Sequence, residues 1–256
     1  MSVVVHGKHP AYGDFLSYGF ETTAAKKLDD WGQAVLPAVR DTRGEGWESA
    51  WLNAPDLRFW IGADVLGTPL FGVWRASHDK VRRLYPLMFG ITGWVTSPPV
   101  HTAHDFSPFE AIERYLVQAE GLDPKNGGVQ ALIQDFELPE ITGSPFQAGQ
   151  NGTLWGRRDD GALSRLLLDA QDVDADSAQF GRSHWWHPAT DSHNAGWLAM
   201  NGLPNSATLV WLLTGRARAG PEADLKINPE TRRSTDTAAA QPSKHPRPER
   251  ADNDTH

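Results

Sequence analysis

The chain has 256 residues, 39% of them hydrophobic and 11 of them tryptophan, which is enough apolar material for one sizeable core. Its net charge of −8 would repel a phosphate backbone, so we expect no nucleic-acid partner. The chain has no cysteine, which excludes disulfides and thiolate chemistry, and no stretch approaches the roughly 20 apolar residues of a spanning helix. We therefore expect a soluble protein without membrane insertion.

The first elements are predicted to be a strand and a helix. The valine run in Val3–Gly7 predicts a buried strand, which ends at a loop rich in Gly and Pro. Thr22 or Thr23 can cap the helix that follows. Apolar residues recur on one face of that helix at Ala24, Leu28, Trp31 and Val35. We expect Pro37 to end the helix, because proline lacks a backbone donor and clashes with the preceding turn.

Three strands and a second helix are predicted next. The strands are rich in aromatic and β-branched residues and are separated by Gly, Pro and Asp turn signals: Leu57–Ile61, Leu70–Trp74 and Tyr85–Ile91. Ser107–Glu110 has the pattern of a capping box with proline at the first helical position. The second helix should therefore begin there and end near Gly121.

The rest of the body is predicted to hold a short helix and further strands. The helix spans Val129–Phe136, and the strands span Thr153–Trp155, Gly196–Met200 and Ala207–Leu213. This order indicates an α/β fold, with a mixed β-sheet flanked by helices, in one main domain over residues 1–215. Residues 216–256 contain no aromatic residue and two large aliphatic ones, so we expect a flexible polar tail there.

The loop Gly7–Phe15 follows a strand and contains a lysine, as phosphate-binding loops do. A P-loop, however, places Gly-Lys-Ser/Thr at the start of a helix, whereas Lys8 precedes His-Pro. The spacing favours a turn in which Gly7 and Gly13 adopt backbone angles that other residues resist. In that turn Asp14 would accept backbone amides.

Two histidine groups are candidates for metal binding. His101, His104 and Asp105 offer imidazoles and a carboxylate in a loop ahead of the second helix, where they could hold zinc or iron. A metal-assisted hydrolase that uses them is therefore an alternative interpretation. The second group is His184, His187 and His193. Its aromatic surroundings favour a partly buried strand or loop in which the ring nitrogens bond to the backbone.

Ser77, His78 and Asp79 have the residue types of a hydrolytic triad. Their contiguity argues against that role, because a fold usually brings triad members together from distant positions. The chain also has no Gly-x-Ser-x-Gly pattern. The sequence therefore gives little support for nucleophilic catalysis.

Three blocks within the first ninety residues are similar to motifs of one family. Gly7–Phe15 resembles the family's Gly-Lys-x-Pro-x-x-Gly-Asp-Phe signature, and Trp51–Phe59 looks like its second block. Ser77–Leu87 is similar to the block Ser-x-Asp-x-Val-Gly-Arg-x-Phe-Pro-Leu, with Arg82 in place of glycine and Tyr85 in place of phenylalanine. On these blocks the chain resembles the TagF (ImpM) family of type VI secretion repressors.

This resemblance implies an α/β fold and a non-enzymatic, post-translational brake on the type VI secretion machine. It implies direct contact in the cytoplasm with the forkhead-associated scaffold protein Fha, and the N-terminus agrees because it lacks the apolar run of a signal peptide. The resemblance brings no catalytic residue and no cofactor. The expected protein-binding residues are Lys8, Asp14, Ser77, Asp79, Arg82 and Arg83. The same blocks also fit a structural role, since Gly, Pro, Asp and aromatic residues mark turns and core contacts.

Overall fold

The computed structural model describes residues 2–92, 106–121, 127–138, 154–174 and 181–214. The proposed metal ligands His101, His104 and Asp105 and the expected tail at 216–256 lie outside these residues. Among the helices that are described, none is both long and apolar enough to cross a bilayer.

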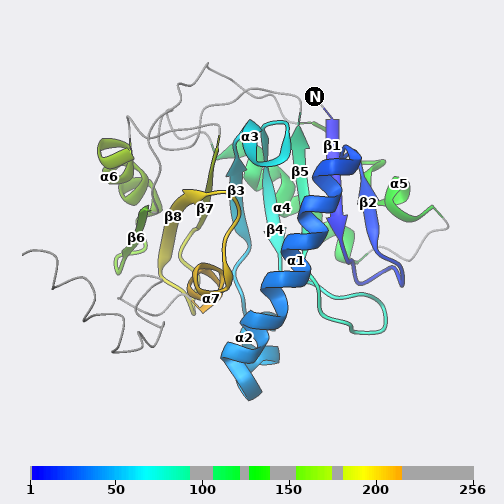
Figure 1. The fold of residues 1–256 in the computed structure, drawn as a ribbon, viewed down its shortest axis with the longest axis horizontal. Helices are drawn as coiled ribbons and strands as arrows, with labels where there is room; N and C mark the ends of the chain where they lie inside the picture. Colours follow the sequence, from blue (N-terminus) through cyan, green and yellow to red (C-terminus); the bar gives the residue numbers. More distant parts are fainter. Residues whose placement is uncertain (1, 93–105, 122–126, 139–153, 175–180, 215–256) are drawn as a thin grey trace, which may run out of the picture. The chain divides into compact units, whose positions relative to one another are not determined.

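One eight-stranded sheet runs through the described part of the chain, in the order β2-β1-β5-β4-β3-β7-β8-β6 (Figure 1). Its strands are β1 (Ser2–Gly7), β2 (Leu16–Tyr18), β3 (Leu57–Ile61), β4 (Leu70–Arg75), β5 (Leu87–Thr92), β6 (Leu154–Arg158), β7 (Arg182–His187) and β8 (Ala195–Asn201). The predicted α/β class, a sheet flanked by helices, is confirmed. Every strand pair is antiparallel where a mixed sheet was expected, because short connections such as those joining β3 to β4 and β7 to β8 reverse the chain.

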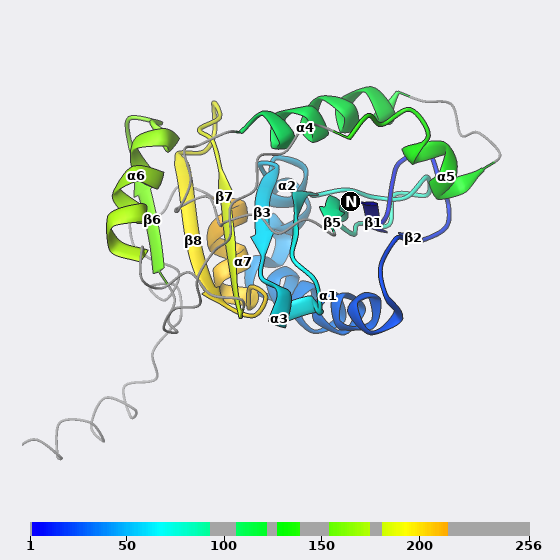
Figure 2. The ribbon, with the colours of Figure 1, turned by 90° about the horizontal axis from the view of Figure 1, so that it is seen from above.

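Helices cover both faces of this sheet (Figure 2). One face packs against α4 (Ser107–Glu120), α5 (Gly128–Ile133) and α6 (Leu163–Asp174). The other face packs against α1 (Thr22–Arg43), α2 (Trp47–Leu52), α3 (Ala63–Leu66) and α7 (Ser206–Thr214), and a single 3-10 turn, Gly44–Gly46, joins α1 to α2. The sheet is thus the middle of three layers.

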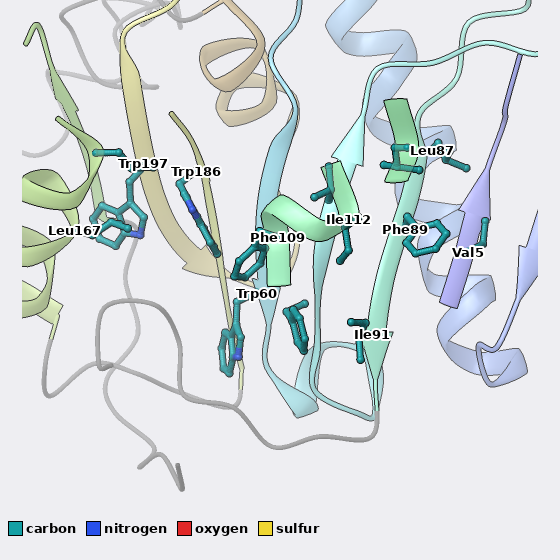
Figure 3. Packing of buried hydrophobic residues seen from close by; sticks show 14 of the residues in the cluster. Val5, Trp60, Leu87, Phe89, Ile91, Phe109, Ile112, Leu167, Trp186 and Trp197 are labelled. Carbon is teal, nitrogen blue, oxygen red and sulfur yellow. The ribbon is translucent and has the colours of Figure 1, made fainter. Parts of the chain in front are cut away.

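Each central strand supplies side chains to both apolar cores. On β7, Trp186 packs on the α4 side and Trp185 on the α1 side, because successive strand residues point to opposite faces. Phe109 of α4 meets Trp186 edge-on, with ring centroids 5.0 Å apart (Figure 3). Burial on both faces explains why strands such as β3 and β5 are apolar at most positions.

Two arginines of the sheet, Arg58 buried and Arg75 partly buried, attach α4 to it. Arg58 of β3 donates to both carboxylate oxygens of Glu113 on α4, at 2.7 and 2.8 Å. Arg75 of β4 donates to both oxygens of Asp56, at 2.8 and 2.6 Å, and to Glu120 at 2.8 Å. Bidentate pairs of this kind fix geometry as well as adding energy. They set how α4 lies on the sheet.

The expected end of the first helix at Pro37 is wrong, because α1 continues to Arg43. Val35 and Val39 on either side of the proline are buried in the core, whereas Pro37 itself is exposed. Packing of the apolar face therefore carries the helix past a residue that weakens it locally.

The predicted strand at Ala207–Leu213 is also wrong, since these residues lie in α7. The helix is buried on nearly every side, so its sequence shows no apolar stripe that separates it from a buried strand. The informative signal is Asn205, whose Oδ1 accepts from the amide of Thr208 at 2.9 Å, as a capping side chain does. The remaining predicted helices and strands are present, whereas β2, α2, α3 and α6 were not predicted. The segment that forms β7 was predicted only as a strand or a loop.

Substitution of Pro37 by alanine should raise the free energy of unfolding by about 1 to 2 kcal/mol, since proline inside a helix costs more than it gains in the unfolded chain. Urea denaturation of the purified protein measures this change. Gln33→Ala, at an exposed position of the same helix, is the control and should change stability by less than about 0.5 kcal/mol. An unchanged or lowered stability of Pro37→Ala would contradict this account.

Candidate functional site

Two loops lie side by side at one end of the sheet, and we call them the two-loop clamp. One loop, residues 8–15, follows β1, and the other, residues 76–86, connects β4 to β5 (Figure 1). The amide of Lys8 donates to the carbonyl of Pro86 at 3.1 Å, and the amide of Lys80 donates to that of Tyr12 at 2.9 Å. Pairing of β1 with β5 brings the loops together, because it places their ends next to each other.

The carboxylate of Asp79 lies at the centre of the clamp and is fully buried. Lys8 Nζ lies 3.1 Å from Oδ2, and Arg83 Nε donates to the same oxygen at 2.5 Å. The other oxygen accepts the amides of Val81 and Arg83 at 3.1 and 2.9 Å. One side chain thus fixes the backbone of its own hairpin and joins it to the N-terminal loop.

These partners decide the charge of Asp79. Burial on its own would raise the pKa of the carboxyl, but hydrogen bonds from Arg83 and Lys8 outweigh burial and hold the pKa well below its usual range. Asp79 is therefore an anion at ordinary pH. A carboxylate held in this way is suited to structure and poorly suited to proton transfer.

The two glycines of the first loop fit there for different reasons. Gly7 has a φ of 130°, and a Cβ atom on it would lie 1.9 Å from the carbonyl oxygen of Pro86. The prediction that Gly7 adopts a backbone angle that other residues resist is therefore confirmed. Gly13 does not have a positive φ, so that prediction is wrong. A Cβ there would instead lie 3.1 Å from Cε of Lys80, which packs over it.

The second motif block reaches the clamp through tryptophan. Trp51 is buried, and its Nε1 donates to the carbonyl of Ser77 at 2.8 Å. Its ring meets Trp74 edge-on at 5.5 Å. On the far side of the hairpin, Tyr85 covers α1 at Gly32, where an added Cβ would lie 2.3 Å from the phenolic oxygen. All three sequence blocks therefore contribute residues to the two-loop clamp or to its contacts with the core.

The six residues predicted to bind a partner separate into two groups. Ser77 and Asp79 are buried, Lys8 is largely buried, and Arg83 has an exposed side chain that reaches back to Asp79 and to the carbonyl of Gly13. Asp14 and Arg82 are exposed at the rim. Asp14 accepts no amide within the described residues, so its expected turn role is wrong. The structural interpretation fits the buried members, and the rim is accessible to a partner.

Arg82 has a φ of 69°, the only positive φ of a non-glycine residue in the described part of the chain. Glycine adopts this conformation without cost, whereas an L residue is strained there. The geometry thus explains why glycine would fit this position of the motif.

Two buried histidines, one in the clamp and one on the neighbouring strand β1, were missed as candidates. Nδ1 of His9 accepts the amide of Ala11 at 3.2 Å, and burial lowers the pKa of His9 to about 4, with the charges of Arg75 and His78 acting in the same direction. His6 on β1 lies 3.2 Å from Asp29 of α1, and burial lowers its pKa too. Sequence spacing gives no signal of such burial.

The later histidines are buried, and two bond to the backbone as predicted. Nδ1 of His187 is 2.9 Å from the carbonyl of Pro188, and Nε2 of His193 is 3.0 Å from that of Leu213. Burial lowers the pKa of His187 to about 4. Within the described residues, no three or more His, Asp or Glu side chains are grouped closely enough to hold a metal.

The contiguous residues Ser77, His78 and Asp79 do not form a triad. Nδ1 of His78 lies 2.8 Å from the backbone carbonyl of Asp79, while the carboxylate of Asp79 faces Lys8 and Arg83. A triad needs the carboxylate on the imidazole, so this geometry does not orient His78 as a base.

Comparison with known proteins matches the part of the chain that contains the clamp to a family. Residues 4–126 match the family described as the TagF N-terminal domain, associated with type VI secretion. This segment is a TagF N-terminal domain. The resemblance drawn from the three blocks is thereby confirmed, and the segment includes both loops of the clamp.

A solved structure extends the similarity beyond the TagF N-terminal domain. The crystal structure of PA0076 from Pseudomonas aeruginosa PAO1 is 27% identical in sequence, with a TM-score of 0.63. The alignment covers 85% of this chain and 96% of that one. No curated protein matches the chain.

Substitution of Asp79 by asparagine should lower the free energy of unfolding by about 3 kcal/mol at pH 7, because Lys8 and Arg83 lose their buried counter-charge. The depressed pKa stabilises the fold above the ordinary carboxyl pKa of 3.8, and that stabilisation is lost as pH falls below it. The difference in the free energy of unfolding between wild type and variant should therefore become smaller below about pH 4. Urea denaturation across a pH series measures both effects.

Asp14→Asn is the matched control, since it removes an exposed carboxylate of the same clamp. It should change stability by less than about 0.5 kcal/mol. An equal loss in the two variants, or a gap that stays constant with pH, would contradict the central role of Asp79.

Proposed function

We propose that this protein regulates a type VI secretion system by binding another protein through the rim of the two-loop clamp. The observation that carries the proposal is that the first and third motif blocks meet at one buried carboxylate, Asp79, with an accessible rim above it. The family's association with type VI secretion gives the setting. The forkhead-associated scaffold protein Fha is the partner that the resemblance implies, and the cytoplasm is where contact would occur.

The rim of the clamp, which includes the exposed residues Asp14, Phe15, Val81 and Arg82, has the composition of a binding surface. Phe15 and Val81 expose 40% and 60% of their area, and charged residues surround them. Apolar groups within a polar border are typical of transient protein interfaces. Asp79 fixes the backbone beneath the rim, so binding of a partner would cost little conformational entropy there.

A binding role also suits the chemistry of the clamp. The buried carboxylate of Asp79 is already neutralised by two cations, and the buried histidine His9 is neutral. Neither group is poised to accept a proton from a substrate near pH 7. We therefore propose a non-enzymatic role, in which the buried groups serve the shape of the surface.

Purified scaffold protein and purified wild type should bind each other in isothermal titration calorimetry at physiological salt. Val81→Gln should weaken that binding by about tenfold, because the contact surface loses an exposed apolar side chain that the partner would bury. Absence of measurable binding by the folded wild type would end the scaffold proposal.

Val117→Gln is the matched control for this experiment. Val117 exposes 64% of its area, as much as Val81, but it belongs to α4 and to neither loop of the clamp. The control should bind the scaffold within about twofold of wild type. Equal weakening by both variants would contradict the placement of the interface on the rim.

A further inference from the structure

The tip of the hairpin between β4 and β5 concentrates positive charge on an acidic protein. We call Lys80–Arg83 the basic tip, and all four of its residues are exposed. It carries three cations around Val81, whereas the chain as a whole has a net charge of −8. The facing loop adds one exposed carboxylate, Asp14, and beneath the tip Lys8 pairs with Asp79. With Lys8 and Asp79 counted, four cations against two carboxylates leave the tip positive.

Arg82 occupies the tip at a conformational cost. Its φ of 69° is held by the hydrogen bond from its amide to the carbonyl of Asp79, at 2.8 Å, and by the carboxylate that binds the amides on either side. Among the residues that the structure describes, the guanidinium reaches only His78, with Nη1 3.5 Å from Nε2. A strained residue whose side chain does little for the fold indicates a role outside it.

We propose that the basic tip binds an acidic segment of a partner protein, with Arg82 as the principal charged contact and Val81 as the apolar one. This rests on the proposed function and adds the chemistry of the partner. A guanidinium presents a planar set of donors that matches a carboxylate with two parallel hydrogen bonds. The tip also presents it on a backbone fixed in advance by Asp79.

A short acidic protein segment fits this surface better than a nucleic acid does. The three cations of the tip lie within four consecutive residues, and the rest of the chain has 21 Lys and Arg (24 − 3) against 32 Asp and Glu. A long polyanion would extend over that repelling surface, whereas a few carboxylates can end within the tip. Opposite charge would also speed association and make it sensitive to salt.

The variants that test this are Arg82→Gly, Arg82→Glu and the control Arg165→Glu. Arg82→Gly removes the cation and relieves the strain, so its melting temperature should stay unchanged or rise by about 2 to 4 °C. Arg165 is exposed on α6, which packs on β6 at the other edge of the sheet from β1 and β2. The control makes the same change in net charge as Arg82→Glu.

Two probes are used with each variant. One is a fluorescein-labelled peptide of alternating Glu and Gly, compared by anisotropy with its Gln counterpart, and the other is the purified forkhead-associated scaffold. Wild type should prefer the Glu peptide. Arg82→Glu should weaken binding of the Glu peptide and the scaffold by about tenfold or more, and Arg82→Gly by at least about threefold. Arg165→Glu should stay within about twofold of wild type.

Several results would overturn the inference. Full affinity of Arg82→Gly, or equal losses in Arg82→Glu and Arg165→Glu, would mean that the tip makes no specific charged contact. Tighter binding of duplex DNA than of the Glu peptide would make the ligand a nucleic acid. A wild-type dimer that Arg82→Glu dissociates in sedimentation experiments would make the ligand a second copy of this chain.

The two probes separate this inference from the proposed function. Selective binding of the Glu peptide without binding of the scaffold would support the basic tip and end the scaffold proposal. Scaffold binding that Arg82→Glu leaves unchanged would overturn the basic tip and support the proposed function.

Discussion

The ionised carboxylate of Asp79, buried between two cations and two amides, is the interaction on which the rest of the clamp depends. A charge without water is tolerated only when its partners replace the lost hydration. Lys8 comes from the first loop and Arg83 from the second, so that requirement fixes their mutual position. The contacts that compensate the buried charge of Asp79 therefore set the shape of the rim.

The sheet supplies the frame in which that requirement can be met. Its apolar faces are each covered by helices, and its strands β1 and β5 pair so that both loops leave from the same end. Trp51 and Tyr85 then connect the hairpin to helices on one face, through a hydrogen bond to Ser77 and close packing on Gly32. The clamp is therefore continuous with the core and does not stand apart from it.

Local signals in the sequence predicted much of the fold and part of the site. Strands such as Leu57–Ile61 were found because aromatic and β-branched runs between turn residues are short and distinctive. Pro37 and α7 were misjudged because tertiary packing decides both, and packing is not visible in local periodicity. The motif blocks pointed to the two loops that lie side by side in the structure. Which of their residues are buried, and the strained φ of Arg82, depend on contacts between segments far apart in the chain.

The two outer strands of the sheet differ sharply from the inner ones. At one edge β2 has three residues, and at the other β6 ends in Arg157 and Arg158. An outer strand with unpaired amides and carbonyls is a template on which other chains can add, and brevity or charge makes that template poor. In the part of the chain described, these edges disfavour strand-by-strand aggregation. A partner protein of the kind proposed would therefore meet side chains, which can discriminate between partners in a way that a bare backbone cannot.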